Sequence, residues 1–172
     1  MPCSFDDKVI IEKAEFKKFT AGGDIFRAGI ISDTQLPPNE KKLEENDLYV
    51  RHLRTALEEL KNNGVDMILF AGDIGDAGSY FAFKTYKNTI DEVFGDDKPV
   101  IQTIMGNHDY WSESALSAST TKMSPSGRYA ASFGRSQNKI LEFNGKQACQ
   151  IYDNACFCYI FLIFFGRTPR KR

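Results

Sequence analysis

Three short polar clusters in the chain contain the residue types that bind metal ions and transfer protons. They read Asp33-Thr34-Gln35, then GDIGD at residues 72–76, then GNHD at residues 106–109. Carboxylate and amide oxygens bind hard divalent cations, and a histidine exchanges a proton near neutral pH. The chain has only one other histidine, His52, in its 172 residues. The pattern therefore predicts a site for a divalent metal ion, with one of the chain's two histidines beside it.

Each polar cluster lies at the end of an apolar run that is typical of a β-strand. The runs are FRAGIIS at 26–32, VDMILFAGD at 65–73 and KPVIQTIMGNHD at 98–109. The clusters follow one another at the spacing of one β-α-β step, which predicts three parallel strands. Ligands bind at the carboxyl ends of the strands in open α/β sheets. We therefore expect the three clusters to meet at one edge of a sheet.

Two helices are predicted between these strands. DTQLPPNE at 33–40 reads as a loop, and apolar residues then recur with helical spacing over residues 46–63, ended by Gly64: Tyr49, Leu53, Ala56 and Leu60. Ser79 is placed to cap a second helix that runs to Gly95, with an apolar face made of Phe83, Tyr86, Ile90 and Val93. Residues 26–109 thus read as β-α-β-α-β.

The two ends of the chain are less regular. Residues 1–24 fit a strand or a helix and are expected to form an N-terminal extension before a domain at 25–172. Residues 112–138 predict a short helix followed by a mobile loop. Asn144-Gly145 lies between two strand-like runs, which predicts a hairpin, and the apolar run at 155–165 predicts a further strand.

Composition excludes several classes of function. A net charge of -1 offers no clear surface for nucleic acid. The four cysteines contain no CxxC pair, which favours reduced thiols in a cytoplasmic protein, and the N-terminus lacks a signal-peptide pattern. The apolar run at 155–165 is shorter than the roughly 20 residues of a membrane-spanning helix, so no transmembrane helix is expected. The oligomeric state stays open.

The three clusters together resemble the motifs of calcineurin-like metallophosphoesterases over residues 26–111. The resemblance implies an α/β fold in which a β-sandwich is flanked by helices. It also implies metal-dependent hydrolysis of phosphomonoesters or phosphodiesters, with a phosphate ester as substrate. By this resemblance Asp33 binds a first metal, Asp73 bridges two metals and Asn107 binds the second.

The resemblance also assigns the proton chemistry and the cofactors. His108 protonates the leaving oxygen or stabilises the transition state, and Asp76 holds its imidazole in position. Gln35 stands where the family more often has a metal-binding histidine, although some branches carry Asp-x-Gln. A neutral oxygen there favours hard ions, so the expected cofactors are two divalent cations, Mn²⁺ first, with iron or zinc as alternatives.

The chain departs from the family in one respect, because the relatives supply further histidines in their second half and none follows His108 here. We interpret this as a domain that is incomplete at its C-terminus, through truncation, a frameshift after about residue 153 or degeneration. Two functions stay open. One is a phosphate-ester hydrolase, and the other is a non-catalytic binding or scaffold module. The retention of His108 beside Asp76 and Asp109 favours descent from an enzyme.

Overall fold

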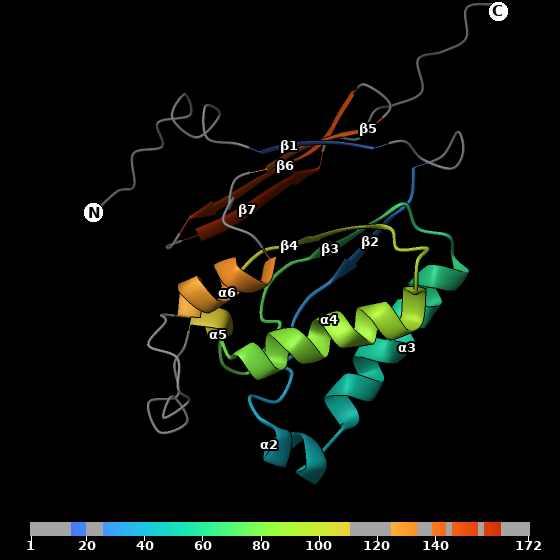
Figure 1. The fold of residues 1–172 in the computed structure, drawn as a ribbon. Coiled ribbons are helices and arrows are strands. Elements are labelled where there is room, and N and C mark those ends of the chain that lie inside the picture. Colours follow the sequence, from blue (N-terminus) through green and yellow to red (C-terminus); the bar gives the residue numbers. More distant parts are fainter. Residues whose placement is uncertain are drawn as a thin grey trace, which may run out of the picture. The chain divides into compact units, whose positions relative to one another are not determined.

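The computed structural model describes residues 15–19, 26–110, 125–133, 139–143, 146–154 and 157–162. The chain divides into two compact units, one of residues 22–135 and one of residues 1–21 together with 136–172. Each unit contains one sheet, and the first adds helices to a parallel sheet (Figure 1). The protein is therefore α/β, as predicted.

The sheet of the unit 22–135 has three parallel strands. They are β2 (Ala28–Ile31), β3 (Met67–Phe70) and β4 (Val100–Thr103), in the order β2-β3-β4. Their last residues are aligned, because Ile31 pairs with Phe70 and Phe70 with Thr103. All three strands and their parallel direction were predicted from the apolar runs. The polar clusters that follow them therefore leave the sheet at one edge.

Five helices accompany this sheet in the described residues of the unit: α2 (Glu40–Glu45), α3 (Leu48–Asn62), α4 (Tyr80–Phe94), α5 (Asn107–Tyr110) and α6 (Pro125–Phe133). The prediction that Ser79 caps α4 is confirmed, because its side chain accepts a hydrogen bond from the N–H of Ala82. Gly64 and Gly95 follow α3 and α4 with φ of +61° and +58°. Both glycines mark the helix ends that the sequence predicted.

Helix α2 was not predicted. The sequence predicts a loop up to residue 40, and it predicts that the next helix begins at Asn46. The side chain of Asn39 caps α2 by accepting from the N–H of Lys42. None of the residues of α2 is buried, so the helix has no apolar face that a pattern could reveal. The chain then leaves helical geometry at Asn46 and Asp47 before α3 begins at Leu48.

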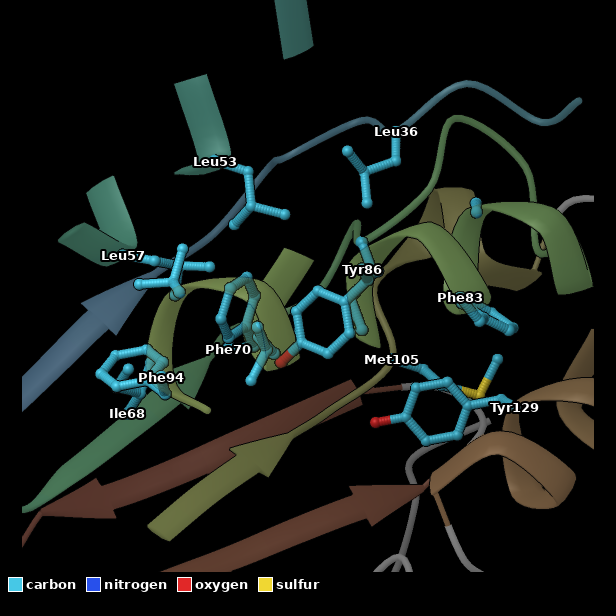
Figure 2. Packing of buried hydrophobic residues seen from close by; sticks show 14 residues of the cluster. Leu36, Leu53, Leu57, Ile68, Phe70, Phe83, Tyr86, Phe94, Met105 and Tyr129 are labelled. Carbon is cyan, nitrogen blue, oxygen red and sulfur yellow. The ribbon is translucent and has the colours of Figure 1, made fainter. Parts of the chain in front are cut away.

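The core of this unit lies between the sheet and its helices. Ile68 and Phe70 of β3 belong to one buried cluster with side chains from α3, α4 and α6, and the ring of Phe70 meets that of Tyr86 edge-on, with centroids 4.6 Å apart (Figure 2). All four apolar residues predicted for the face of α4 are buried. On α3 the prediction was wrong at Tyr49, which lies in the first turn and is 44% exposed, while Leu57 is fully buried.

The second sheet contains β1 (Glu15–Phe19), β5 (Lys139–Phe143), β6 (Lys146–Asn154) and β7 (Phe157–Leu162), in the order β1-β5-β6-β7. β5, β6 and β7 pair antiparallel in succession, which confirms the predicted pairing of the two strand-like runs and the further strand after them, while the turn residues 144–145 lie outside the described residues. β1 pairs parallel with β5, so the undecided N-terminal segment contains a strand.

Some predictions lie outside the described residues or are not tested by them. The expected mobile loop falls mainly on residues 111–124 and 134–138, which the structure does not describe. The division into an extension at 1–24 and a domain at 25–172 stays a prediction. Among the helices that the structure describes, none is long and apolar enough to cross a membrane.

Candidate metal and acid–base site

The pairing of β2 with β3 continues beyond both strands into the loops that carry the first two polar clusters. The N–H of Asp33 donates to the carbonyl of Gly72 at 3.1 Å, and the N–H of Gln35 donates to the carbonyl of Asp73 at 3.1 Å. Leu36 then forms an isolated parallel bridge with Gly75. The structure therefore places the backbone of the predicted metal ligands Asp33 and Gln35 directly beside that of Asp73.

These three residues share an unusual backbone conformation. Asp33, Gln35 and Asp73 have φ of +56°, +47° and +54°, and they are the non-glycine residues with positive φ in the described part of the chain. This left-handed region costs a residue with a Cβ atom roughly 1–2 kcal/mol. Strain of this kind persists only where the surroundings impose it, and it is concentrated at functional sites. All three positions are predicted metal ligands.

The third polar cluster packs against the second without room for a side chain between them. A Cβ atom on Gly106 would lie 2.1 Å from Oδ1 of Asp73, and one on Gly72 would lie 2.7 Å from Cα of Gly106. The N–H of His108 donates to the same Oδ1 of Asp73 at 2.9 Å. The glycines of GDIGD and GNHD thus allow the backbone of one loop to touch the carboxylate of the other.

Asp109 joins the same two loops through a fully buried carboxylate. It accepts hydrogen bonds from the backbone N–H groups of Ile74 at 3.2 Å, Gly75 at 3.0 Å and Gly106 at 3.0 Å. Burial raises the pKa of this carboxyl, the three hydrogen bonds oppose that effect, and the neighbouring charge of Asp73 raises the pKa further. Sequence reasoning gave Asp109 no role in the site.

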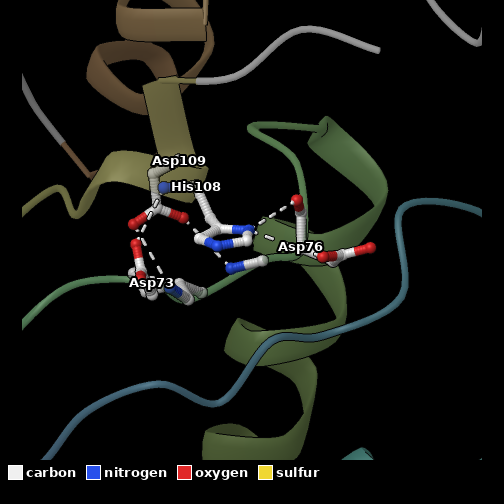
Figure 3. Close-up of polar contacts among 6 residues, drawn as sticks. Asp73, Asp76, His108 and Asp109 are labelled. Atoms are coloured by element: carbon white, nitrogen blue, oxygen red, sulfur yellow. Dashed lines mark hydrogen bonds and ion pairs between the residues drawn. The ribbon is translucent and has the colours of Figure 1, made fainter.

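His108 lies against Asp76, as the resemblance implied. Its Nδ1 is 3.2 Å from the main-chain carbonyl oxygen of Asp76 and 3.5 Å from the carboxylate Oδ1 (Figure 3). A carbonyl oxygen only accepts, so this hydrogen bond requires the proton on Nδ1. The His108 side chain is 23% exposed and that of Asp76 is 54% exposed. The structure thus brings together the two residues predicted to handle the proton.

Asn107 begins α5 and is exposed, between the glycine that touches Asp73 and the histidine that contacts Asp76. The four predicted ligands would supply two carboxylates and two amides, and such oxygen donors fit hard divalent cations in kind. Within the described ranges no group of three or more histidine, cysteine, aspartate or glutamate side chains is placed to hold a metal ion. The residues present therefore fit part of a metal shell.

A second feature that the sequence did not reveal joins α6 to this region. The guanidinium Nε of Arg128, a buried residue of α6, donates to the carbonyl of Gly78, two residues after Asp76. Tyr129, its neighbour on α6, donates its hydroxyl to Oγ1 of Thr103 at the end of β4 at 2.6 Å. α6 thus contacts both the loop after β3 and the end of β4.

The chain matches a family model described as calcineurin-like phosphoesterase over residues 26–166. This range contains all three polar clusters and every predicted site residue. A comparison with curated proteins finds no match.

Proposed function

The chain belongs to the calcineurin-like phosphoesterase family, and on that premise we propose that it hydrolyses phosphate esters at the edge formed by its three polar clusters. The family supports metal-dependent hydrolysis of phosphate esters in general. The observation that carries the proposal for this chain is the contact of His108 with both Asp73 and Asp76, which brings the proposed acid–base residue beside one predicted metal ligand and beside the residue predicted to position its imidazole.

Asp33, Gln35, Asp73 and Asn107 are the residues that would hold the divalent cations. Two divalent cations at such a site neutralise the charge of a phosphate and lower the pKa of bound water. Mn²⁺ is the proposed ion, because all four side chains offer oxygen. The three N–H bonds to Asp109 support this assignment, since they hold the loops of Asp73 and Asn107 against each other.

His108 is the proposed general acid. Water forms a new bond to phosphorus, the ester bond to the alcohol breaks, and the alcohol oxygen takes a proton from Nε2 of His108. Nδ1 keeps its own proton in the contact with Asp76, so Nε2 is the nitrogen that exchanges protons. A cytoplasmic location belongs to the same proposal and rests on the cysteine pattern.

The decisive experiment measures hydrolysis of bis(4-nitrophenyl) phosphate and 4-nitrophenyl phosphate by the purified chain with Mn²⁺. His108→Ala is expected to lower kcat by about 10²- to 10⁴-fold, the usual contribution of a general acid. His52→Ala is the matched control, because it removes the other histidine, an exposed residue of α3, and leaves the rate unchanged. Equal rates for the wild-type chain and His108→Ala would favour the non-catalytic scaffold function.

Metal binding is tested separately from turnover by thermal unfolding with and without Mn²⁺. Asp73→Asn keeps an acceptor for the N–H of His108 but removes a charge, so it is expected to abolish the Mn²⁺-induced rise in Tm. Asp96→Asn, on the exposed turn after α4, serves as the control and keeps the full rise. A shift that persists in Asp73→Asn would contradict the assigned site, and a larger shift with Zn²⁺ would contradict the choice of Mn²⁺.

A further inference from the structure

A pocket of about 350 Å³ adjoins the candidate site in the unit 22–135. Gln35 and Asp76, two of the predicted site residues, lie in its lining, and the rest comes from the segment between β2 and the first turn of α3. Its volume is at the lower end of the roughly 300–1,000 Å³ typical of sites for organic ligands, and it exceeds what a phosphate group alone needs. The pocket therefore has room for the organic part of a phosphate ester.

A second pocket of about 340 Å³ provides a contrast within the same unit. It lies between α3 and α4 and is lined by residues that include Arg54, Glu58 and Lys61, with no predicted site residue among them. Size alone therefore does not distinguish the two pockets. What distinguishes the first is its continuity with Asp76, the residue that contacts the proposed acid His108.

The charges in the first pocket disfavour an anionic occupant. Lys42 is the one cationic side chain among the lining residues. Its Nζ is 3.2 Å from Oε2 of Glu45, which also lines the pocket. These two charges offset each other, and the exposed carboxylate of Asp76 adds a negative charge at the end next to His108. A negatively charged group in this pocket would gain little from Lys42, whose charge Glu45 offsets, and would be repelled by the carboxylate of Asp76.

The remaining lining offers a surface for a ring. Tyr49 is one of the few large apolar residues that are exposed in the described part of the chain, and it lines the pocket together with Pro37 and Pro38. Aromatic rings pack favourably on such surfaces, and tyrosine loses little conformational entropy when it is covered. The exposure of Tyr49, which breaks the predicted apolar pattern of α3, is explained if the residue contacts a ligand.

We propose that this pocket binds the alcohol part of the phosphate ester and that it selects an uncharged, ring-bearing alcohol. The inference rests on the proposed hydrolase function and adds a substrate class to it. The phosphate lies at the three polar clusters, and the alcohol extends past Asp76 towards Tyr49. When the ester bond breaks, the alcohol oxygen takes its proton from His108, which contacts Asp76 in the lining of the pocket.

The test compares two aryl esters of the same shape, 4-carbamoylphenyl phosphate and 4-carboxyphenyl phosphate, with Mn²⁺. The uncharged ester is expected to have a kcat/KM at least about five-fold higher, because Asp76 repels the carboxylate of the other ester while Glu45 offsets the attraction of Lys42. Glu45→Gln is expected to reduce that ratio at least about two-fold, and because the same esters are used, differences in their intrinsic reactivity cancel. A ratio that favours the carboxylate, or one that Glu45→Gln leaves unchanged, overturns the choice of an uncharged group.

The ring contact is tested with Tyr49→Ala, which is expected to lower kcat/KM for 4-carbamoylphenyl phosphate about ten-fold relative to methyl phosphate. Arg54→Ala, in the second pocket, is the matched control and leaves this ratio unchanged. Tyr49 and Arg54 are both partly exposed, so both variants are expected to fold, as their Tm values will show. An unchanged ratio in Tyr49→Ala overturns the proposal.

A binding measurement separates this inference from the proposed function. 4-Carbamoylphenyl phosphonate has a carbon–phosphorus bond to its ring and cannot be hydrolysed, so calorimetry with Mn²⁺ reports binding alone. One outcome is that the wild-type chain binds the phosphonate, Tyr49→Ala does not bind it, and no ester is hydrolysed. This result would support the pocket and contradict the hydrolase function. If esters are hydrolysed but Tyr49→Ala binds the phosphonate as tightly as the wild type, the pocket fails and the function stands. If the chain neither hydrolyses the esters nor binds the phosphonate, both the pocket and the hydrolase function are overturned.

Discussion

The carboxyl edge of the β2-β3-β4 sheet and the layer formed by α3 and α4 both gather charged side chains, but they hold them differently. At the edge, the buried carboxylates of Asp73 and Asp109 accept hydrogen bonds from backbone N–H groups. Around the helices, Arg54 pairs with Glu92 and Lys98 with Asp91, and these side chains are between 40% and 59% exposed.

The comparison shows which charged side chains the fold holds in a fixed place. A backbone donor belongs to the chain itself, so a buried carboxylate that accepts several of them is fixed relative to the sheet and is costly to remove. Holding two solvated side chains together costs conformational entropy, so such exposed ion pairs contribute at most about 1 kcal/mol to the free energy of unfolding. Substitutions at the strand ends should therefore change stability and metal binding far more than substitutions of the helix pairs.

The largest effect is expected for Gly106→Ala. The added Cβ atom would lie 2.1 Å from Oδ1 and 2.4 Å from the backbone nitrogen of Asp73, so the two loops must separate. We expect the free energy of unfolding to fall by at least about 3 kcal/mol, measured by urea denaturation. Gly64→Ala is the control, because Gly64 also has positive φ but has open space around it, and about 1 kcal/mol is expected there. Equal losses would contradict the close contact.

The next largest effect is expected for Asp109→Asn. An amide has one acceptor oxygen for three backbone N–H donors and turns its own N–H₂ towards some of them. The free energy of unfolding should fall by about 2 kcal/mol, and the amides of Ile74, Gly75 and Gly106 should exchange hydrogen faster by NMR. Asp97→Asn, on an exposed turn, should change neither quantity. Unchanged exchange at the three amides would refute this role of Asp109.

A smaller effect, of opposite sign, is expected for Tyr86→Phe in α4. The Tyr86 hydroxyl is buried and has no hydrogen-bond partner among the described residues, so its removal should raise the free energy of unfolding by about 1 kcal/mol. Burial, together with the charges of Tyr129 and Asp109, also raises the pKa of Tyr86 well above 10.0. The unfolded chain therefore loses this proton at lower pH than the folded chain does.

The free energy of unfolding of the wild type therefore falls as the pH rises above 10.0. Tyr86→Phe has no hydroxyl to titrate at this position, so its free energy of unfolding lacks the part of the fall that Tyr86 causes. The gain in stability of the variant should accordingly grow on going from pH 8 to pH 11, roughly the range in which tyrosine titrates. Tyr49→Phe, at an exposed tyrosine, gives the control profile. A gain that is independent of pH would contradict the raised pKa.

The smallest effect is expected when the exposed ion pair is broken. Arg54→Ala should change the free energy of unfolding by less than about 0.5 kcal/mol, since both partners are substantially solvated. The Mn²⁺-induced rise in Tm should stay the same, because Arg54 lies in the α3–α4 layer and not at the strand ends. A loss as large as that of Asp109→Asn would remove the distinction between the two regions.

Much of the parallel unit could be predicted from the sequence because its signals are local. Three apolar runs, the first ended by a proline-rich loop and the other two by glycine, predicted the three strands, and Ser79 with the apolar spacing after it predicted α4. Helix α2 escaped prediction because it buries none of its residues and depends on the Asn39 cap. Tyr49 was misplaced because helical spacing cannot tell a buried face from one that lines a pocket.

The candidate site was likewise predicted only in part from the sequence. Residue types and spacing were enough to nominate Asp33, Asp73 and His108, since each follows a strand of one sheet. The role of Asp109 was beyond such reasoning, because two of its donors, Ile74 and Gly75, are more than 30 residues away and offer only backbone groups. A sequence does not show which carboxylate will collect backbone N–H groups from another loop.

The left-handed backbone at Asp33, Gln35 and Asp73 has a consequence for anyone who engineers this protein. Glycine is the residue best suited to that conformation, so a screen for thermostability alone should enrich glycine at Asp33 and Gln35, whereas the buried carboxylate of Asp73 accepts the N–H of His108 and should be retained. Each glycine variant would relax the main chain and at the same time delete a proposed metal ligand. Selection for heat resistance and selection for turnover should therefore pull these two codons in opposite directions.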